Sequence, residues 1–304
     1  MADPVNPLFN VIRVDTRDAD AMEQLGTKKK FWLGPTGPRR TLFKAEERGH
    51  GEDWSEKVAC ELARLLGLPH VQYDLAYDEA LDLPGVVTDN FLAEDEALIH
   101  GNQMLLALDA TYPAAGNRFT VTQHTIDAIH RVVKLLEPPA GCPDFGEGPS
   151  AVGAFAGYLL LDAWIANQDR HHENWGAILG QKMLRLAPTY DHASCLARNL
   201  KDDRRQGLLD NERIPGFARK AASAIQVRAG GTKCLSTVAA FRAWSHLAPV
   251  GAKYWVELLR MVKDKATDDI LSAVPPDRMT DLCRTFTLKL LQENRRRLLD
   301  GEVQ

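Results

Sequence analysis

The segment Trp164–Asp191, WIANQDRHHENWGAILGQKMLRLAPTYD, decides the fold. Its apolar beginning gives way to a crowd of polar side chains between Asp169 and Asn174, and a second apolar, strand-like run at residues 184–187 leads to Asp191. Carboxylate and amide oxygens in this arrangement can orient a hydroxyl group and hold a divalent metal ion against the phosphates of a nucleotide. We therefore ask whether the rest of the chain supplies the remainder of such a site.

Asp169, Asn174 and Asp191 can divide this chemistry between them. Asp169 follows an apolar helix-like run, in a loop where its carboxylate can accept a hydrogen bond from an attacking hydroxyl. Mg²⁺ prefers oxygen ligands and usually takes only a few from protein. We therefore predict that Asp191 is the main Mg²⁺ ligand and that Asn174 is the second.

Two adjacent histidines lie in the same loop. His171 is predicted to support the loop through hydrogen bonds, whereas His172 and Glu173 are predicted to face solvent. Neighbouring histidines point in different directions and no third ligand follows at helical spacing, which disfavours a zinc hydrolase site. The chain also lacks GxSxG and a matched Cys–His pattern, so a catalytic nucleophile of those kinds is not predicted.

Composition describes an ordinary globular protein. The chain has 304 residues, of which 45% are hydrophobic and 26% charged, with a formal net charge of −4. It is long enough for two lobes, and it has no basic field that would favour direct nucleic-acid binding. The most apolar window, residues 151–166, contains Asp162 and is too short to span a membrane. Five cysteines without a CxxC pair, together with the absence of a signal-peptide pattern, predict a cytoplasmic location.

The N-terminal part is predicted to be a small sheet. Residues 9–14, 30–33 and 41–44 are predicted to form three antiparallel strands in meander order. Two further strands, residues 71–77 and 86–92, are predicted on either side of a Leu-Pro-Gly turn.

A helix is predicted between these two groups of strands, from residue 54 to about residue 66. Asp53 has the residue type of an N-cap, and Glu56, three positions later, completes a capping-box pattern. Gly67 is predicted to end the helix. The N-terminal lobe, residues 1–93, is thus expected to be an antiparallel sheet with one helix.

The remainder, residues 94–304, is predicted to be a larger and mainly helical lobe, which makes the whole chain an α+β protein. Ser150 is predicted to cap a buried helix that follows a Pro- and Gly-rich loop, and residues 195–235 are predicted to be charged and partly irregular. The predicted helices cover residues 127–136, 151–166, 237–247, 252–262, 267–273 and 280–299.

The small lobe offers a candidate for the opposite wall of the site. Lys44 ends an apolar strand, where its stem can be buried, and a buried ammonium group needs a partner. Glu56 is the predicted partner and Glu61 the alternative; such a Lys–Glu pair positions nucleotide phosphates in kinases. Lys44 as a surface residue at a strand end is the competing interpretation.

A glycine-containing turn could contribute to phosphate binding. Gly26, in the turn at residues 26–30, allows backbone N–H groups to approach a phosphate closely, and Thr27 adds a hydroxyl. The same turn could equally be only a hairpin connection.

Taken together, these motifs resemble the HipA-type kinases, bacterial serine/threonine kinases with a protein-kinase-like, bilobal fold. The resemblance is carried by Asp-Arg-His-x-x-Asn at residues 169–174 and Leu-Ala-Pro-x-Tyr-Asp at residues 186–191. Gly26-x-x-x-Lys30, Lys44, and Glu56 followed by KVACELARLLGLP match the same family in register. The first motif is also similar to that of phosphatidylinositol kinases, which are more distant relatives.

The resemblance implies roles for these residues. Asp169 would be the catalytic base, with Lys44 and Glu56 completing the catalytic set, and Asn174 and Asp191 would hold Mg²⁺. Residues 87–94 would be the hinge beside adenine. The residues that the resemblance places around ATP are Gly26, Thr27, Lys30, Lys44, Val87, Phe91, Asn174 and Asp191.

The sequence departs from the family in two places. The serine that these kinases carry three residues before the loop glycine, where they autophosphorylate, is replaced by Glu23, so modification at that position is not expected. About two dozen residues precede the loop, so the N-terminal subdomain that helps to bind an antitoxin is expected to be absent. The expected partners are ATP, a protein substrate of unknown identity, and an antitoxin-like regulator.

Three other functions stay open on the sequence alone. The chain could phosphorylate a small molecule or a lipid, although no basic amphipathic helix of the membrane-surface type stands out. It could transfer another group, such as AMP, in the same cleft. It could also be a nucleotide-binding regulatory protein without turnover, against which the joint presence of Lys44, Asp169, Asn174 and Asp191 argues.

Overall fold

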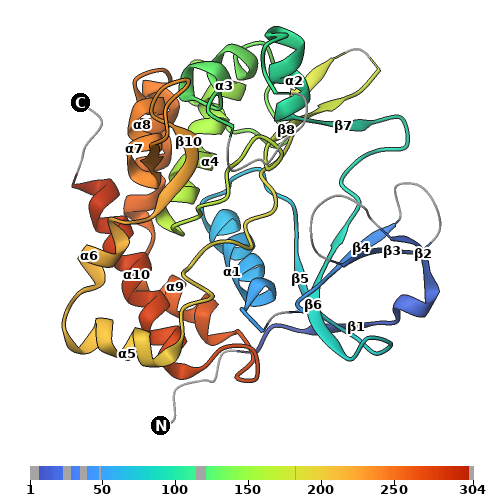
Figure 1. Ribbon diagram of the computed structural model, residues 1–304, viewed down its shortest axis with the longest axis vertical. Helices are drawn as coiled ribbons and strands as arrows, with labels where there is room; N and C mark the ends of the chain where they lie inside the picture. Colours follow the sequence, from blue (N-terminus) through green and yellow to red (C-terminus); the bar gives the residue numbers. More distant parts are fainter. Residues whose placement is uncertain are drawn as a thin grey trace.

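The computed structural model describes residues 7–22, 29–34, 40–47, 49–113, 121–181 and 183–300. A curved sheet lies on one side of the molecule and most of the helices lie on the other, with helix α1 between them (Figure 1). This is the bilobal α+β architecture expected from the sequence.

The larger sheet has the strand order β1-β5-β6-β4-β3-β2. Every neighbouring pair in it is antiparallel except β1 and β5, which run parallel. The strands are β1 (Val11–Val14), β2 (Ala19–Met22), β3 (Lys30–Leu33), β4 (Thr41–Ala45), β5 (Asp74–Asp78) and β6 (Leu83–Asp89).

The position of β1 corrects the predicted meander of residues 9–46. β2, β3 and β4 do form a meander, but Val11 in β1 pairs with Leu75 in β5, at the opposite edge of the sheet. The turn after β1 is anchored there, because the backbone N and the hydroxyl of Thr16 donate to the Asp78 carboxylate at 2.9 and 2.6 Å. This anchor is distant in sequence, and the local alternation of residues 9–14 gives no sign of it.

The Leu-Pro-Gly turn is a second correction. Leu83, Pro84 and Gly85 lie inside β6, and the turn that joins β5 to β6 comprises residues 79–82. Asp82 in that turn has a φ of 56°, in the left-handed region that aspartate tolerates better than most residues.

Helix α1 (Glu52–Leu65) begins earlier than predicted, and the capping box is wrong. Its N-cap is Gly51, with a φ of 72°. Asp53 lies inside the helix and forms a buried ion pair with Arg278, while Glu56 faces the loop that follows Asp191. The end of the helix is as predicted, because Gly67 follows it with a φ of 68°.

Gly51→Ala should test how strongly this turn holds α1. An added Cβ would meet the Trp54 indole ring, and the left-handed φ disfavours any L side chain. We expect a loss of about 1–3 kcal/mol in the free energy of unfolding, measured by urea denaturation. Gly207→Ala is the matched control, because Gly207 lies in a helix with nothing within 4 Å of its added Cβ. Equal unfolding midpoints for the two variants would contradict the prediction.

The C-terminal part is built around α4 (Ala151–Trp164), whose side chains are almost all buried. A helix that is apolar all round belongs in a core, and α4 contacts α3, α7, α8 and α10. Ser150 caps it as predicted, since its hydroxyl accepts from the backbone N of Gly153 at 3.0 Å. The other helices are α2 (Gly101–Leu108), α3 (Ile126–Val133), α5 (Asp202–Asp210), α6 (Ile214–Ala218), α7 (Thr237–Ser245), α8 (Pro249–Met261), α9 (Asp264–Ser272) and α10 (Asp281–Leu299).

Two smaller sheets complete this part of the chain. One comprises β7 (Ala97–His100), β8 (Gly176–Leu179) and β9 (Leu184–Leu186), and the other pairs β10 (Ala222–Gln226) with β11 (Cys234–Ser236). The sequence predicted neither β7 nor α2, and it underestimated the order of α5 and α6. Across the described residues, no helix is both long enough and apolar enough to cross a membrane.

Candidate active site

Lys44 brings three side chains of the candidate site together. Its Nζ lies 3.5 Å from Glu56 Oε2, 3.1 Å from Asp191 Oδ1 and 3.3 Å from the Tyr73 hydroxyl. Lys44 and Glu56 have only 9% and 1% of their side-chain surface exposed, against 28% for Asp191. The predicted pairing of Lys44 with Glu56 is therefore present, and the same ammonium group also contacts the predicted metal ligand.

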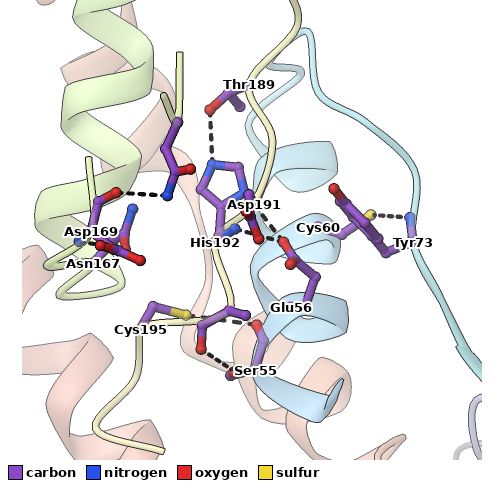
Figure 2. A network of polar contacts seen from close by, with 12 residues as sticks. Ser55, Glu56, Cys60, Tyr73, Asn167, Asp169, Thr189, Asp191, His192 and Cys195 are labelled. Carbon is purple, nitrogen blue, oxygen red and sulfur yellow. Dashed lines mark hydrogen bonds and ion pairs between the residues drawn. The ribbon is translucent and has the colours of Figure 1, made fainter. Parts of the chain in front are cut away.

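Helix α1 is bonded to the loop that follows Asp191 (Figure 2). The other carboxylate oxygen of Glu56, Oε1, accepts from the backbone N of His192 at 2.6 Å. One residue earlier, the Ser55 hydroxyl donates to the carbonyl oxygen of Ala193 at 2.8 Å. The alternative partner Glu61 instead pairs with Lys57 at 2.6 Å. Glu56 thus fixes both the cation of the small lobe and the backbone beside Asp191.

The Lys44 ammonium group stays charged in this setting. Burial opposes the charge, but the carboxylates of Asp191 and Glu56 outweigh it, so the pKa of Lys44 is raised well above its ordinary value. A desolvated cation that is held by partly exposed Asp191 is a suitable contact for a nucleotide phosphate.

Asp169 and Asn174 hold each other within one loop. The Asn174 amide nitrogen donates to the carbonyl oxygen of Asp169 at 2.8 Å, and the backbone N of Asp169 donates to Asn167 Oδ1 at 3.2 Å. Because the amide nitrogen of Asn174 is turned to a carbonyl, its Oδ1 is the end available to a cation. The Ser194 hydroxyl donates to Asp169 Oδ2 at 3.3 Å, which joins this loop to the segment after Asp191.

The two histidines of this loop behave differently. His171 Nδ1 accepts from the backbone N of Glu173 at 3.1 Å, which confirms its predicted support of the loop, and its Nε2 lies 3.6 Å from Asp169 Oδ1. The prediction that His172 faces solvent is wrong. His172 is 5% exposed, and the Tyr112 hydroxyl lies 2.8 Å from its Nδ1. No helix or strand was predicted for the part of the sequence that contains Tyr112. The Glu173 side chain is 44% exposed, as expected.

Strained backbone marks both loops. Asp191 has a φ of 58°, and Ala166, just before the Asp169 loop, has a φ of 53°. Non-glycine residues seldom adopt this left-handed region, and such residues concentrate at functional sites. The strained positions are thus Asp191 itself and Ala166, three residues before Asp169.

The predicted phosphate-binding loop is only partly visible. Gly26 and Thr27 lie outside the described residues. Lys30 is the first residue of β3 and pairs in register with Lys44 on β4. Registered partners on antiparallel strands share a face of the sheet, so Lys30 lies on the same face as Lys44.

The predicted hinge contact at Val87 needs correction. Val87 pairs in register with Phe43 and packs with Phe43, Ala45 and Ala76, whereas Lys44 pairs with Val86. Successive strand residues point to opposite faces, so Val87 faces away from Lys44. Val86 lies on the Lys44 face instead.

Phe91 lies beside the segment that carries Asp191. Its ring stacks on that of Tyr190, with centroids 6.2 Å apart and planes 24° apart. The Tyr190 hydroxyl donates to the carbonyl oxygen of Glu173 at 2.9 Å. Phe91 is therefore connected through Tyr190 to both loops of the site.

Sequence reasoning missed four residues that hold these loops, namely Asp162, Arg170, Thr189 and His192. All four are at most 2% exposed. Burial and the neighbouring Arg170 lower the pKa of His192 well below its ordinary value, so this imidazole is neutral. Asp162, an acidic residue within an apolar run, was the one available signal, because a buried carboxylate requires a partner.

Comparison with known proteins shows the fold and the family of this chain. The molecule has the fold of a protein-kinase-like enzyme, with the candidate site between a small sheet and a helical part. A sequence profile of the HipA-like C-terminal domain matches residues 22–245, and the chain belongs to this family. Family membership supports a kinase function.

Two solved structures share the fold. The Helicobacter pylori proinflammatory kinase CtkA aligns with a TM-score of 0.71 and 15% sequence identity, covering 97% of this chain and 100% of that one. HipA of Shewanella oneidensis MR-1, in a complex with HipB and operator DNA from a toxin–antitoxin system, aligns with a TM-score of 0.56 and 12% identity, covering 94% and 69%. A search of curated protein sequences gives no significant match.

Proposed function

We propose that the chain is an ATP- and Mg²⁺-dependent kinase of HipA type that phosphorylates serine or threonine hydroxyls of a protein. The observation that carries the proposal is the cluster of Lys44, Glu56 and Asp191, with Asp169 bonded to Ser194, three residues after Asp191. It supplies a fixed cation, a partly exposed carboxylate and, on an adjoining loop, a candidate base.

In this proposal each residue has one task. Lys44, fixed by Glu56, contacts the phosphates of ATP, and Lys30 adds a second cation on the same face. The donor set of Asp191 and Asn174 fits Mg²⁺, which would neutralise charge on the phosphates. Asp169 accepts the proton of the substrate hydroxyl.

The reaction balances with these groups alone. The substrate oxygen forms a bond to the γ-phosphorus, the bond from that phosphorus to the β,γ-bridging oxygen breaks, and ADP leaves. The hydroxyl proton passes to Asp169. Positioning and charge neutralisation supply most of the acceleration in phosphoryl transfer, which is consistent with a site built from so many fixed contacts.

The remaining assignments stay proposals. Gly26 and Thr27 would cover the phosphates, and Val86 and Phe91 would line the adenine side. The lobe boundary at residue 93 is supported by the end of β6 at Asp89 and the start of β7 at Ala97. An antitoxin-like regulator is proposed by analogy with the HipA–HipB complex of Shewanella.

Lys44→Met tests the proposed phosphate contact. We expect it to lower phosphate transfer from Mg·ATP to proteins of a heat-inactivated bacterial lysate by about 100-fold, because one preorganised charge at the transferring group is removed. Lys253→Met, at an exposed position on α8, is the control and should match the parent. Transfer by Lys44→Met at the parental rate would show that Lys44 does not serve the nucleotide.

A further inference from the structure

The buried guanidinium group of Arg170 contacts both chain segments that carry the proposed metal ligands, Asn174 and Asp191. Its Nη1 donates to the carbonyl oxygen of Asn174 at 2.6 Å. Its Nη2 donates to Thr189 Oγ1 at 3.0 Å and lies 3.1 Å from His192 Nε2. Thr189 and His192 lie on either side of Asp191 in the chain, so Arg170 spans the distance between the Asn174 and Asp191 segments.

Arg170 is itself held from the core. Its Nε donates to Asp162 Oδ2 at 2.7 Å and its Nη2 to Asp162 Oδ1 at 2.8 Å, a bidentate pair of the strongest kind. Asp162 lies near the end of the buried helix α4, and its Oδ1 also accepts from the Asn167 amide at 2.8 Å. The position of the guanidinium is therefore set from a helix that is buried in the core.

The connection continues through His192 to the small lobe. His192 Nε2 lies 3.1 Å from Arg170 Nη2 and 2.8 Å from the Thr189 hydroxyl. Nδ1 lies 3.8 Å from Glu56 Oε1, which also accepts from the backbone N of His192. Figure 2 shows His192 between Thr189 and Glu56, beside Asp191. The segment that carries Asp191 is thus held on both sides.

We propose that Arg170 is a positioning residue that sets the separation and orientation of Asn174 and Asp191, and thereby the affinity of the nucleotide site for its divalent cation. The inference rests on the proposed function of this site. The competing explanation is that Arg170 serves only the stability of the fold, since removing one partner of a buried ion pair is strongly destabilising. The two explanations differ in their effect on the cation.

The test measures how much Mg²⁺ is required for nucleotide binding. The non-hydrolysable analogue adenylyl imidodiphosphate is held at a fixed concentration, Mg²⁺ is titrated, and the thermal shift of the protein gives the half-saturating Mg²⁺ concentration. Arg170→Lys keeps the charge and loses the planar fork. We expect it to raise that concentration by about 10- to 100-fold, the usual effect of losing a partner that orients metal ligands.

Two further variants make the outcome specific. Arg205→Lys is the matched control, because Arg205 is also buried and bonds to Asp202 and to backbone carbonyl oxygens, on α5. It should lower the melting temperature and leave the Mg²⁺ requirement unchanged. Thr189→Val removes one hydroxyl between Arg170 and His192 and keeps the shape, and we expect a smaller rise in the Mg²⁺ requirement.

A Mg²⁺ requirement equal to the parent's in folded Arg170→Lys would overturn the inference. If Arg170→Lys does not fold, Thr189→Val decides, and an unchanged requirement in that variant has the same meaning. A parent that shows no Mg²⁺-dependent binding of the analogue would remove the proposed function together with this inference. A parent that binds normally, with variants that match it, would remove only the role of Arg170.

Discussion

Asp169→Asn is expected to lower phosphoryl transfer by about 10²- to 10⁴-fold, the usual contribution of a general base, and to leave Mg·ATP binding intact. Asparagine keeps the shape of the side chain and can still accept from the Ser194 hydroxyl, but it cannot take the proton of a substrate hydroxyl. Lys44, Glu56 and Asp191 are untouched by the change, so the nucleotide contacts remain.

The two effects are measured separately. Transfer of labelled phosphate to lysate proteins reports the chemical step, and the thermal shift with Mg²⁺ and adenylyl imidodiphosphate reports binding. Asp281→Asn is the control, because the Asp281 side chain is 98% exposed at the start of α10. If Asp169→Asn transferred phosphate as well as the parent, another group would have to be the base.

Asp191→Asn is expected to abolish the Mg²⁺-dependent part of nucleotide binding. Asn retains the hydrogen-bonding shape and tolerates the φ of 58°, so backbone strain does not confuse the result. At a ligand concentration about 100 times the dissociation constant, the parent should gain about 2.7 kcal/mol of stability from Mg·ATP. The variant should lose most of this gain, because the negative charge that faces both Lys44 and the proposed cation is gone.

A metal-free experiment gives the corresponding control for Asp191. With EDTA present, the parent should show the same weak nucleotide response as Asp191→Asn. A full Mg²⁺-dependent thermal shift in Asp191→Asn would contradict the assignment of this residue as the main ligand.

The parts of the site that the sequence predicted are those with local signals. Asp169, Asn174 and Asp191 lie in one segment whose apolar and polar runs place them at the ends of a helix and a strand. The pairing of Lys44 with Glu56 was likewise predicted from their places at the end of a strand and near the start of the next helix. Their contact in the structure follows from two short elements that are adjacent in the chain.

The parts that were missed depend on contacts distant in sequence. β1 pairs with β5 because Thr16 is anchored to Asp78, which no local pattern reveals. The expected place of Val87 beside ATP came from the resemblance alone, and the register of β6 turns the Val87 side chain away from Lys44.

Arg170 was missed and His172 was misjudged because the burial of a polar side chain depends on its partners. Both are polar residues in a polar run, yet they are buried against Asp162 and Tyr112, which come from other segments. The polar character of a loop does not show which of its side chains point inward, because that depends on the partners the fold brings to them.

The central claim, transfer of the γ-phosphate to protein hydroxyls, is tested most directly with two labelled forms of ATP. The parent and Asp169→Asn are incubated with Mg²⁺, heat-inactivated bacterial lysate, and ATP labelled at either the γ- or the α-phosphorus, and labelled proteins are hydrolysed to amino acids. We predict label from γ-ATP only, recovered as phosphoserine or phosphothreonine, with the parent and not with the variant. Label from α-ATP would show AMP transfer, and no protein label from either form would contradict the proposed protein kinase activity.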